Sequence, residues 1–142
     1  MRALLDVNML LALFDPGHTF HARAQNWWAA NERHGWASCP LTENGFLRII
    51  CQPSYARPVS FPNARHLLRN WAVPPRHVFW PDDISLLDTT VIDPARPLGP
   101  KQLTDVYLLA LAVRHGGRLI TLDRRISITS VRGATGEHLA TP

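Results

Sequence analysis

Hydrophobic residues along the chain form two kinds of pattern, short apolar runs and longer stretches with helical spacing. The short runs end at polar residues, prolines or glycines, and each is too brief for a helix. They predict strands at 2–6, 36–39, 77–80 and 118–122, with a further short strand near 138–140. Helical spacing predicts helices at 8–14, 18–34, 41–51, 63–73 and 104–115, the last of them capped by Thr104.

The order of these elements indicates the fold class. Strands that alternate with helices imply a parallel sheet with helices on both faces. The helix expected at 104–115 is apolar nearly all round its centre, so we expect it to be buried. The segment 81–100 is rich in prolines and acids and leaves room for one short helix. A chain of 142 residues has the size of one domain, which would span 1–142.

Four acidic residues stand where such a sheet would place its functional edge. Asp6 and Asp123 end apolar runs, and Glu43 and Asp105 follow threonines at the starts of predicted helices. In parallel sheets, ligands bind beyond the carboxyl ends of the strands. Carboxylates gathered there repel one another and need a cation, and a hard divalent metal such as Mg²⁺ or Mn²⁺ prefers their oxygens.

Each acid also has an ordinary structural explanation. Asp6 and Asp123 could cap helices, Asp105 could complement a helix dipole, and Glu43 could be a solvated residue of a first turn. The combination favours a metal site, because a carboxylate-held metal neutralises the charge that develops in phosphodiester hydrolysis and activates a water. The sequence contains no Gly-x-Ser-x-Gly elbow and no phosphate-cradling glycine loop. It therefore predicts a metal-dependent phosphodiesterase.

The charge of the chain fits a polyanionic substrate. The net charge is +4 with a pI near 9.8, and Lys101 is the only lysine among the cations. Arginine offers a planar fork that suits phosphate oxygens, although a GC-rich genome would also enrich arginine. The arginines that could contact the phosphates of such a polyanion are Arg76, Arg114, Arg118 and Arg132.

Aromatic and metal-binding residue types add little to this interpretation. Three tryptophans at helix positions are expected to be buried, namely Trp27, Trp28 and Trp71. Trp36 and Trp80 lie near strand ends, but a role in stacking on bases is disfavoured for both. His18 and His21 are three residues apart, but no cysteine or acid completes a zinc site with them.

The expected compartment is the cytoplasm. No apolar run approaches the roughly 20 residues of a membrane span, and Asp6 follows the start too closely for the apolar core of a signal peptide. Cys39 and Cys51 are accordingly expected to be reduced and buried.

Four segments together resemble the PIN-domain ribonucleases, and in particular the toxins of VapBC-type toxin–antitoxin pairs. They are Leu5-Asp6-Val7-Asn8, Thr42-Glu43-Asn44-Gly45, Thr104-Asp105-Val106-Tyr107-Leu108-Leu109-Ala110-Leu111-Ala112 and Leu119-Ile120-Thr121-Leu122-Asp123. They occur in the family's order and extend from about residue 2 to 125. The third segment is quite specific, whereas Asp-x-Asn alone is weak.

The resemblance implies a three-layer α/β/α sandwich with a mostly parallel sheet. It implies that Asp6, Glu43, Asp105 and Asp123 bind Mg²⁺ or Mn²⁺, and that Asn8 and Thr121 orient ligands or water behind them. It also implies cleavage of structured RNA, often transfer or ribosomal RNA, to a 5′-phosphate and a 3′-hydroxyl. The implied partners are a small antitoxin, whose tail occupies the acidic pocket, and a second copy of the chain in a homodimer.

One departure from the family pattern follows the fourth acid. Some PIN nucleases carry a further acid there, whereas this chain has Arg124 and Arg125. We therefore expect one tightly held metal rather than two. The two arginines either face the phosphates of the RNA or are plain surface charges.

Two other functions stay open. A PIN-like domain could serve binding or scaffolding alone, although the presence of all four acids disfavours this. A phosphatase of the haloacid dehalogenase type would use an aspartyl nucleophile after the first strand, but it wants a second acid where this chain has Asn8.

Overall fold

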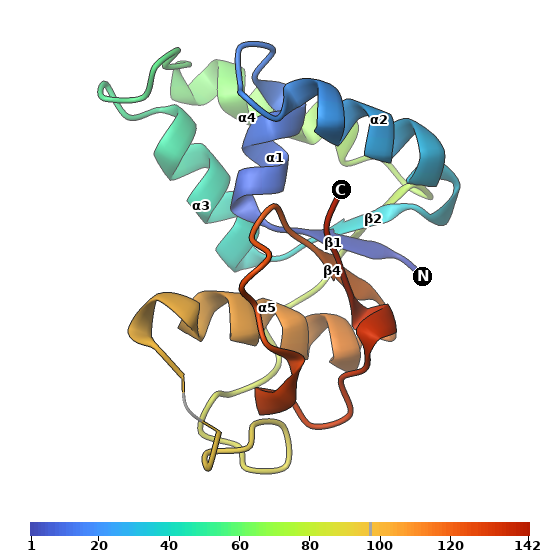
Figure 1. The fold of residues 1–142 in the computed structure, drawn as a ribbon. Coiled ribbons are helices and arrows are strands. Elements are labelled where there is room, and N and C mark those ends of the chain that lie inside the picture. The colour runs from blue at the N-terminus through green and yellow to red at the C-terminus, as the bar shows by residue number, and fades with distance from the viewer. Residues whose placement is uncertain (97) are drawn as a thin grey trace.

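Strand β1 (Ala3–Leu5) lies near the middle of a five-stranded sheet in the computed structural model, which describes residues 1–96 and 98–142 (Figure 1). The strand order is β3-β2-β1-β4-β5, and every pair of neighbours runs parallel. Ala3 is in register with Trp36 on one side and with Arg118 on the other. The remaining strands are β2 (Trp36–Ser38), β3 (His77–Phe79), β4 (Arg118–Ile120) and β5 (Leu139–Ala140).

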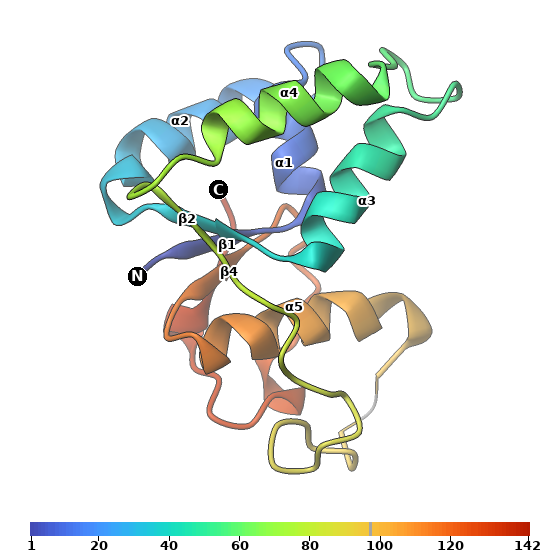
Figure 2. The same cartoon turned by 180° about the vertical axis from the view of Figure 1, so that it is seen from behind.

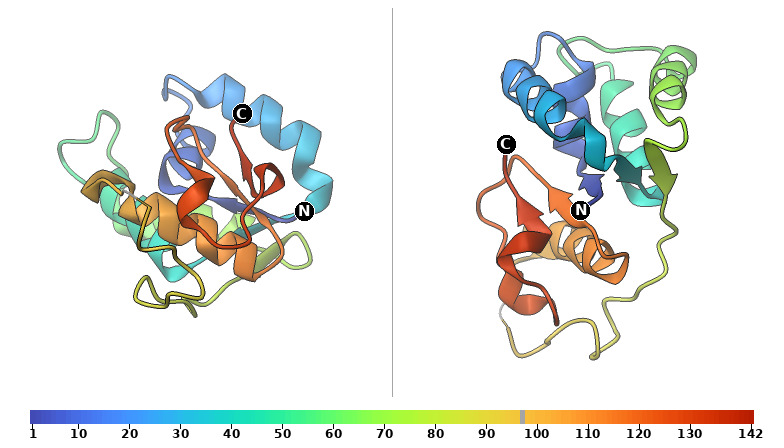
Figure 3. Two further views of the ribbon diagram at one scale, coloured as in Figure 1. Left: turned by 60° about the horizontal axis from the view of Figure 1, so that its bottom comes forward. Right: turned by 90° about the vertical axis from the view of Figure 1, so that its right-hand side faces the viewer.

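Helices cover both faces of this sheet, as the alternation of elements predicts (Figures 1 and 2). One face carries α1 (Val7–Phe14), α2 (His21–Asn31), α3 (Pro40–Ile50) and α4 (Phe61–Trp71). The opposite face carries α5 (Leu103–Arg114) and the short 3-10 helices η3 (Ile128–Ser130) and η4 (Gly136–His138), a division that is plain in the side view of Figure 3. Two further 3-10 helices are η1 (Glu32–His34) and η2 (Pro100–Gln102). The predicted three-layer α/β/α class is confirmed.

Alternation along each strand divides the buried residues between two cores. Leu5 and Trp36 belong to the core beneath α1–α4, whereas Leu4 and Ala37 belong to the core against α5. Helix α5 is buried along its apolar centre, as expected. Because side chains of a strand alternate between faces, the apolar runs in β1 and β4 are those of strands buried on both sides.

Several helices begin at other residues than the sequence predicts. Helix α5 begins at Leu103 with Gln102 at its N-cap, so the assignment of Thr104 as the cap is wrong. Helix α4 begins at Phe61, because Ser60 caps it and Pro62 suits a first turn. The stretch predicted as a helix from 18 to 34 is helical as α2 only from His21, and it ends in the 3-10 turn η1.

The three tryptophans expected to be buried are less buried than the other two. Trp27, Trp28 and Trp71 are only partly buried, where they pack on one another or on the core. Trp36 and Trp80 are 0% and 5% exposed, so neither can stack on a base of RNA. Trp80 is covered by the ring of His115, whose centroid lies 4.7 Å away in a stacked arrangement.

The structure also bears on the expectations for the cysteines, for the segment 81–100 and for membrane spans. Cys39 is buried and Cys51 half-buried, and both are free thiols. In the described part of 81–100 there is no α-helix, and Pro97 of that segment lies outside the described residues. No helix within residues 1–96 and 98–142 is long and apolar enough to cross a membrane.

Candidate functional site

Asp6 follows β1 directly and lies at the carboxyl edge of the sheet. Its side chain is 4% exposed, and its Oδ1 accepts a hydrogen bond from the Met9 backbone N–H at 2.6 Å, which caps α1. The pKa of Asp6 is raised to about 6, mainly by burial and to a smaller extent by the charges of Asp105 and Asp123. Hydrogen bonds from the Thr121 hydroxyl and the Met9 backbone N–H stabilise the carboxylate and lower its pKa in part.

Asp123 lies beyond the end of the neighbouring strand β4. Its backbone N–H donates to the hydroxyl of the fully buried Thr121 at 3.0 Å, which fixes the turn after the strand. Its carboxylate accepts from the Arg125 guanidinium at 3.0 and 2.8 Å and from the Arg125 backbone N–H at 2.8 Å. These hydrogen bonds lower the pKa of Asp123 to about 2, so the carboxylate is ionised at neutral pH.

Asp105 lies in the first turn of α5 and completes a group of three coupled carboxylates. Burial raises its pKa, and the charge of Asp123 raises it further. Asp105 and Asp123 line one cavity of about 360 Å³, together with Arg125 and Lys101. Segments about a hundred residues apart in the sequence thus bring Asp6, Asp105 and Asp123 within electrostatic reach of one another.

Asn8 is exposed at the start of α1 and lines a second cavity of about 390 Å³. That cavity shares Asp123 and Arg125 with the first, so the two hollows adjoin at the same ion pair. The side chains that complete the second cavity are His18, Phe20 and Leu122. Asn8 is therefore placed where its amide can reach a molecule bound beside Asp123.

Glu43 is engaged by a different set of residues. The Ser38 hydroxyl donates to Glu43 Oε1 at 2.6 Å, and Ser38 Oγ also lies 2.7 Å from His77 Nε2. Because a hydroxyl has a single proton, His77 is the donor in the second bond. Burial lowers the pKa of His77 to about 4, which keeps the imidazole neutral. Glu43 lines a third cavity, of about 320 Å³, against α4 rather than the cavity of Asp105 and Asp123.

The donor set suits a hard divalent cation, because it consists of carboxylates of which one is deeply buried and destabilised by its neighbours. In the arrangement observed, however, no three histidine, cysteine, aspartate or glutamate side chains of the described residues are close enough to enclose a metal ion. The Arg125–Asp123 and Ser38–Glu43 hydrogen bonds both hold carboxylates that a metal would need.

The candidate RNA contacts are divided between two edges of the sheet. Arg124 and Arg125 are exposed at the carboxylate edge. Arg76 and Arg118 lie at the opposite edge, where Arg76 is 3.7 Å from Glu32 and Arg118 opens β4. Arg114 ends α5, and Arg132 donates to the Thr89 carbonyl at 2.7 Å.

Sequence reasoning missed Ser38, His77 and Phe20, and it considered His18 only as a zinc ligand. Ser38 ends a strand at the same edge as Asp6, so a search for every polar side chain at strand ends, rather than for acids alone, would have found it. His77 was visible only as the start of a strand. His18 and Phe20 depend on how the turn before α2 folds, which hydrophobic spacing does not encode.

Comparison with known proteins agrees with this architecture. The PIN domain model matches residues 3–131. Ribonuclease VapC44 of Mycobacterium tuberculosis is 52% identical over 141 residues, covering 99% of each chain. Ribonuclease VapC39 of the same organism is 39% identical over 134 residues, covering 94% of this chain and 96% of the relative.

A solved structure shares the fold at low sequence identity. It is a chain of the crystal structure of VapBC2 from Rickettsia felis bound to a DNA fragment from their promoter. The TM-score is 0.57 at 11% identity, over 87% of this chain and 89% of that one. The family model and the close relatives, rather than this distant likeness, decide the assignment: the chain belongs to the PIN domain family and, within it, to the VapC group.

Proposed function

We propose that the chain is a metal-dependent endoribonuclease and the toxin of a type II toxin–antitoxin pair. The observation that carries the proposal is the gathering of Asp6, Asp105 and Asp123 at one edge of a parallel sheet, where Asp105 and Asp123 line one cavity and Asp6 follows the strand that pairs with β4. Relatives that cover nearly the whole chain are named ribonucleases, which supports RNA as the substrate. Membership of the PIN family sets aside a phosphatase of the haloacid dehalogenase type.

Asp6, Asp105 and Asp123, with Glu43, are the residues that would hold Mg²⁺ or Mn²⁺. The bound cation would supply charge neutralisation and an activated water for hydrolysis of the phosphodiester. Thr121 holds the backbone of Asp123 in place, and the exposed Asn8 amide is available to orient water or a phosphate oxygen. Arg124 and Arg125 at the same edge supply positive charge for the RNA backbone.

Metal binding by all four acids would require Asp123 and Glu43 to leave their present hydrogen-bond partners, Arg125 and Ser38. Arg125 must release the Asp123 oxygens, and this guanidinium is then free to bind a phosphate of the substrate. Glu43 must turn away from Ser38 if it is to join the other three acids. Both pairs involve partly exposed carboxylates, so the exchange requires side-chain rotation and leaves the sheet intact.

The partners follow from the same proposal. The solved VapBC2 complex of Rickettsia felis supports a small antitoxin as the protein partner. A structured RNA, either transfer or ribosomal, is the proposed substrate, and a homodimer in the cytoplasm is the proposed form of the free chain.

A second candidate function is a PIN-like domain that binds RNA or a protein without cleaving. It is favoured by one observation, that Asp123 and Glu43 are both occupied by other residues of the described chain. Metal-dependent cleavage separates the two candidates.

The test is cleavage of transfer and ribosomal RNA by the purified chain with Mg²⁺, with Mn²⁺ and with a chelator. We expect cleavage that requires metal and disappears in Asp6→Ala and in Asp105→Asn. Each variant replaces a carboxylate with a neutral side chain that cannot balance the charge of the cation. Glu137→Gln, which alters an exposed acid on η4, is the matched control and should cleave normally. Normal cleavage by Asp105→Asn would refute the site, and metal binding without cleavage would favour the second candidate.

A further inference from the structure

An exposed aromatic side chain stands beside the carboxylate edge. Phe20 is 41% exposed, although a side chain of its size is usually buried. It lines the cavity that also contains Asn8, Asp123 and Arg125. The His18 ring lies 6.0 Å from the Phe20 ring, tilted by 45°, and lines the same cavity. Two rings therefore border the hollow that adjoins the candidate site.

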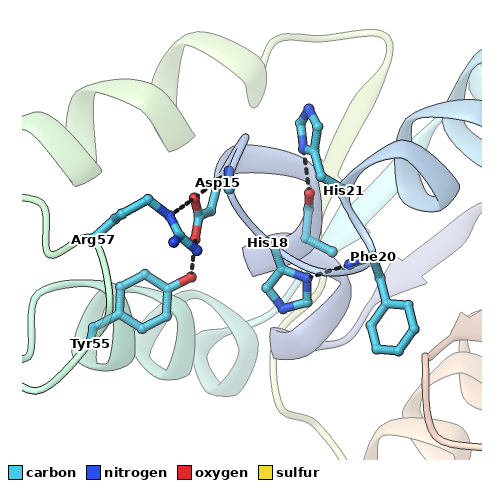
Figure 4. Close-up of polar contacts among 8 residues, drawn as sticks. Asp15, His18, Phe20, His21, Tyr55 and Arg57 are labelled. Carbon is cyan, nitrogen blue, oxygen red and sulfur yellow. Dashed lines mark hydrogen bonds and ion pairs between the residues drawn. The ribbon is translucent and has the colours of Figure 1, made fainter.

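The turn that carries these rings, residues 15–20, is held by a cluster of hydrogen bonds to Asp15. Asp15 is 4% exposed, and Arg57 donates to its two oxygens at 2.7 Å each. The Tyr55 hydroxyl donates to the same carboxylate at 2.6 Å, and the Gly17 N–H donates to it at 2.9 Å. Figure 4 shows Arg57 and Tyr55 converging on Asp15, while the rings of His18 and Phe20 lie on the other side of the turn.

Local hydrogen bonds also hold the backbone of this turn and the ring of His18. The Phe20 N–H donates to His18 Nδ1 at 3.1 Å, so the ring nitrogen that remains, Nε2, carries the proton of the neutral imidazole. A ring nitrogen of His21 lies 2.7 Å from the Ala12 carbonyl, which ties the start of α2 to α1. A platform that is ordered before it binds loses little conformational entropy on binding.

The charges around the rings suit a nucleotide. The Arg23 guanidinium lies 5.9 Å from the centroid of the Phe20 ring, and Arg125 borders the same cavity on the side of Asp123. An aromatic ring stacks on any base, and nearby arginines attract the phosphates that flank it.

We propose that Phe20, with His18 beside it, is a stacking site for one unpaired base of the RNA, next to the phosphate that enters the carboxylate edge. This rests on the proposed function and adds to it that the substrate presents an unstacked base beside the cleaved bond. A base in a continuous duplex cannot reach the ring, so the subsite selects loops, bulges and single strands. The polar cluster at Asp15 serves this site by holding the turn.

The test compares two labelled strands in the presence of a chelator, so that binding is measured without cleavage. One is a short fluorescein-labelled oligo(A) RNA, and the other is a sugar-phosphate strand of the same length and charge that has no bases. Fluorescence anisotropy gives the affinity of each. We expect the wild-type chain to prefer oligo(A) by at least about fivefold, the lower end of what one base–aromatic stack contributes.

The variants separate the ring from its surroundings. Phe20→Ala and Phe20→Leu should lose most of that preference while they bind the base-free strand unchanged, and Phe20→Trp should keep it. Phe79→Ala removes another aromatic ring, 49% exposed on β3, and should keep the preference. An unchanged preference for oligo(A) in Phe20→Ala would overturn the inference. That result is also the one expected if the ring serves a protein partner instead of RNA.

The outcome for the proposed function is read separately from metal-dependent cleavage. Cleavage by the wild-type chain with no role for Phe20 would refute only the stacking site. Base preference that depends on Phe20 without any cleavage would keep the stacking site and refute the nuclease. A wild-type chain that neither binds oligo(A) nor cleaves RNA would refute both.

Discussion

Arg125 binds Asp123 through both arms of its guanidinium, Nε to Oδ1 at 3.0 Å and Nη2 to Oδ2 at 2.8 Å. The pair forms within the turn after β4, because the two residues are only two positions apart. Each oxygen of Asp123 thus faces a cation supplied by the chain itself. A divalent metal that binds Asp123 must compete with this arginine, which makes the pair a natural first target for mutation.

Arg125→Ala should tighten the binding of Mn²⁺. The variant frees both oxygens of Asp123 and removes a positive charge from the cavity that contains Asp105. The gain should be a few-fold at most, because an exposed ion pair contributes little in water. Isothermal titration calorimetry measures it, and Arg124→Ala, which removes a neighbouring exposed arginine, is the control. Equal affinities in the two variants would show that Arg125 does not compete with the metal.

His77 should make the protein less stable in mild acid. Its folded pKa of about 4 lies below its ordinary value of 6.5, so the unfolded chain binds more protons between these pH values. The stability contributed by the neutral, buried imidazole is complete above pH 6.5 and is lost as the pH falls towards 4. The loss is on the order of 3 kcal/mol.

The control for this prediction is His77→Gln, which stays neutral and can still donate to Ser38. Asp6 titrates in the same range with the opposite sign, because its raised pKa stabilises the folded state as the pH falls. The difference between the urea-unfolding free energies of the wild type and His77→Gln isolates the contribution of His77. A difference that does not change with pH would contradict the prediction.

Asp15→Asn should destabilise the fold by about 2 kcal/mol, because the change removes charge-assisted hydrogen bonds from Arg57 and Tyr55. Arg57 is the main cause of the lowered pKa of Asp15, so the wild-type protein keeps this stability above pH 3.8 and loses it in stronger acid. Thermal or urea unfolding measures the loss. Asp93→Asn is the control, since Asp93 meets Arg96 and Arg132 only at 3.7 and 3.6 Å and should cost less than 1 kcal/mol, about the value of a surface pair.

Gly17→Ala should weaken the same cluster without changing any charge. A Cβ at Gly17 would overlap the guanidinium of Arg57 and push it away from Asp15. We expect part of the loss seen in Asp15→Asn. Gly136→Ala, at a position where a Cβ meets open space, should leave the unfolding free energy nearly unchanged. Equal stability of the two alanine variants would show that Arg57 adapts without cost.

The affinity for RNA should fall steeply with salt. The net charge is +4, and each arginine that meets a phosphate releases counterions from the RNA. Anisotropy at several salt concentrations, in a chelator, gives the slope. Arg124→Ala should reduce the slope and Arg76→Ala should not, because Arg76 lies at the opposite edge of the sheet. A flat response would exclude a basic track for RNA.

The sequence predicted the parts of the structure that follow from periodicity. All five strands and the five main helices occur where apolar runs and helical spacing indicate them. The proximity of Asp6 and Asp123 follows from two strands that run parallel and end together, which alternation with helices implies. Asp105 joins them because α5 starts at the same edge.

The remainder depends on packing that one-dimensional patterns do not contain. Trp36 is buried and Trp71 is not fully so, although both are large and apolar, because Trp36 lies on an inner strand and Trp71 at the end of an outer helix. Glu43 faces Ser38 because of the direction in which α3 leaves β2. The stacking of Trp80 on His115 joins segments that have no shared motif.

The pairing of β1 with β4 has a consequence for the order of events during synthesis. Leu5 pairs with Ile120, so the central strand remains open on one side until β4 has been translated. Asp6 is made well before Asp123, so the acidic edge cannot form until synthesis has passed β4. Closing so long a loop is also slow. A nascent chain that has not yet reached residue 123 therefore lacks this edge, and any activity that depends on the edge begins only after Asp123 has been made.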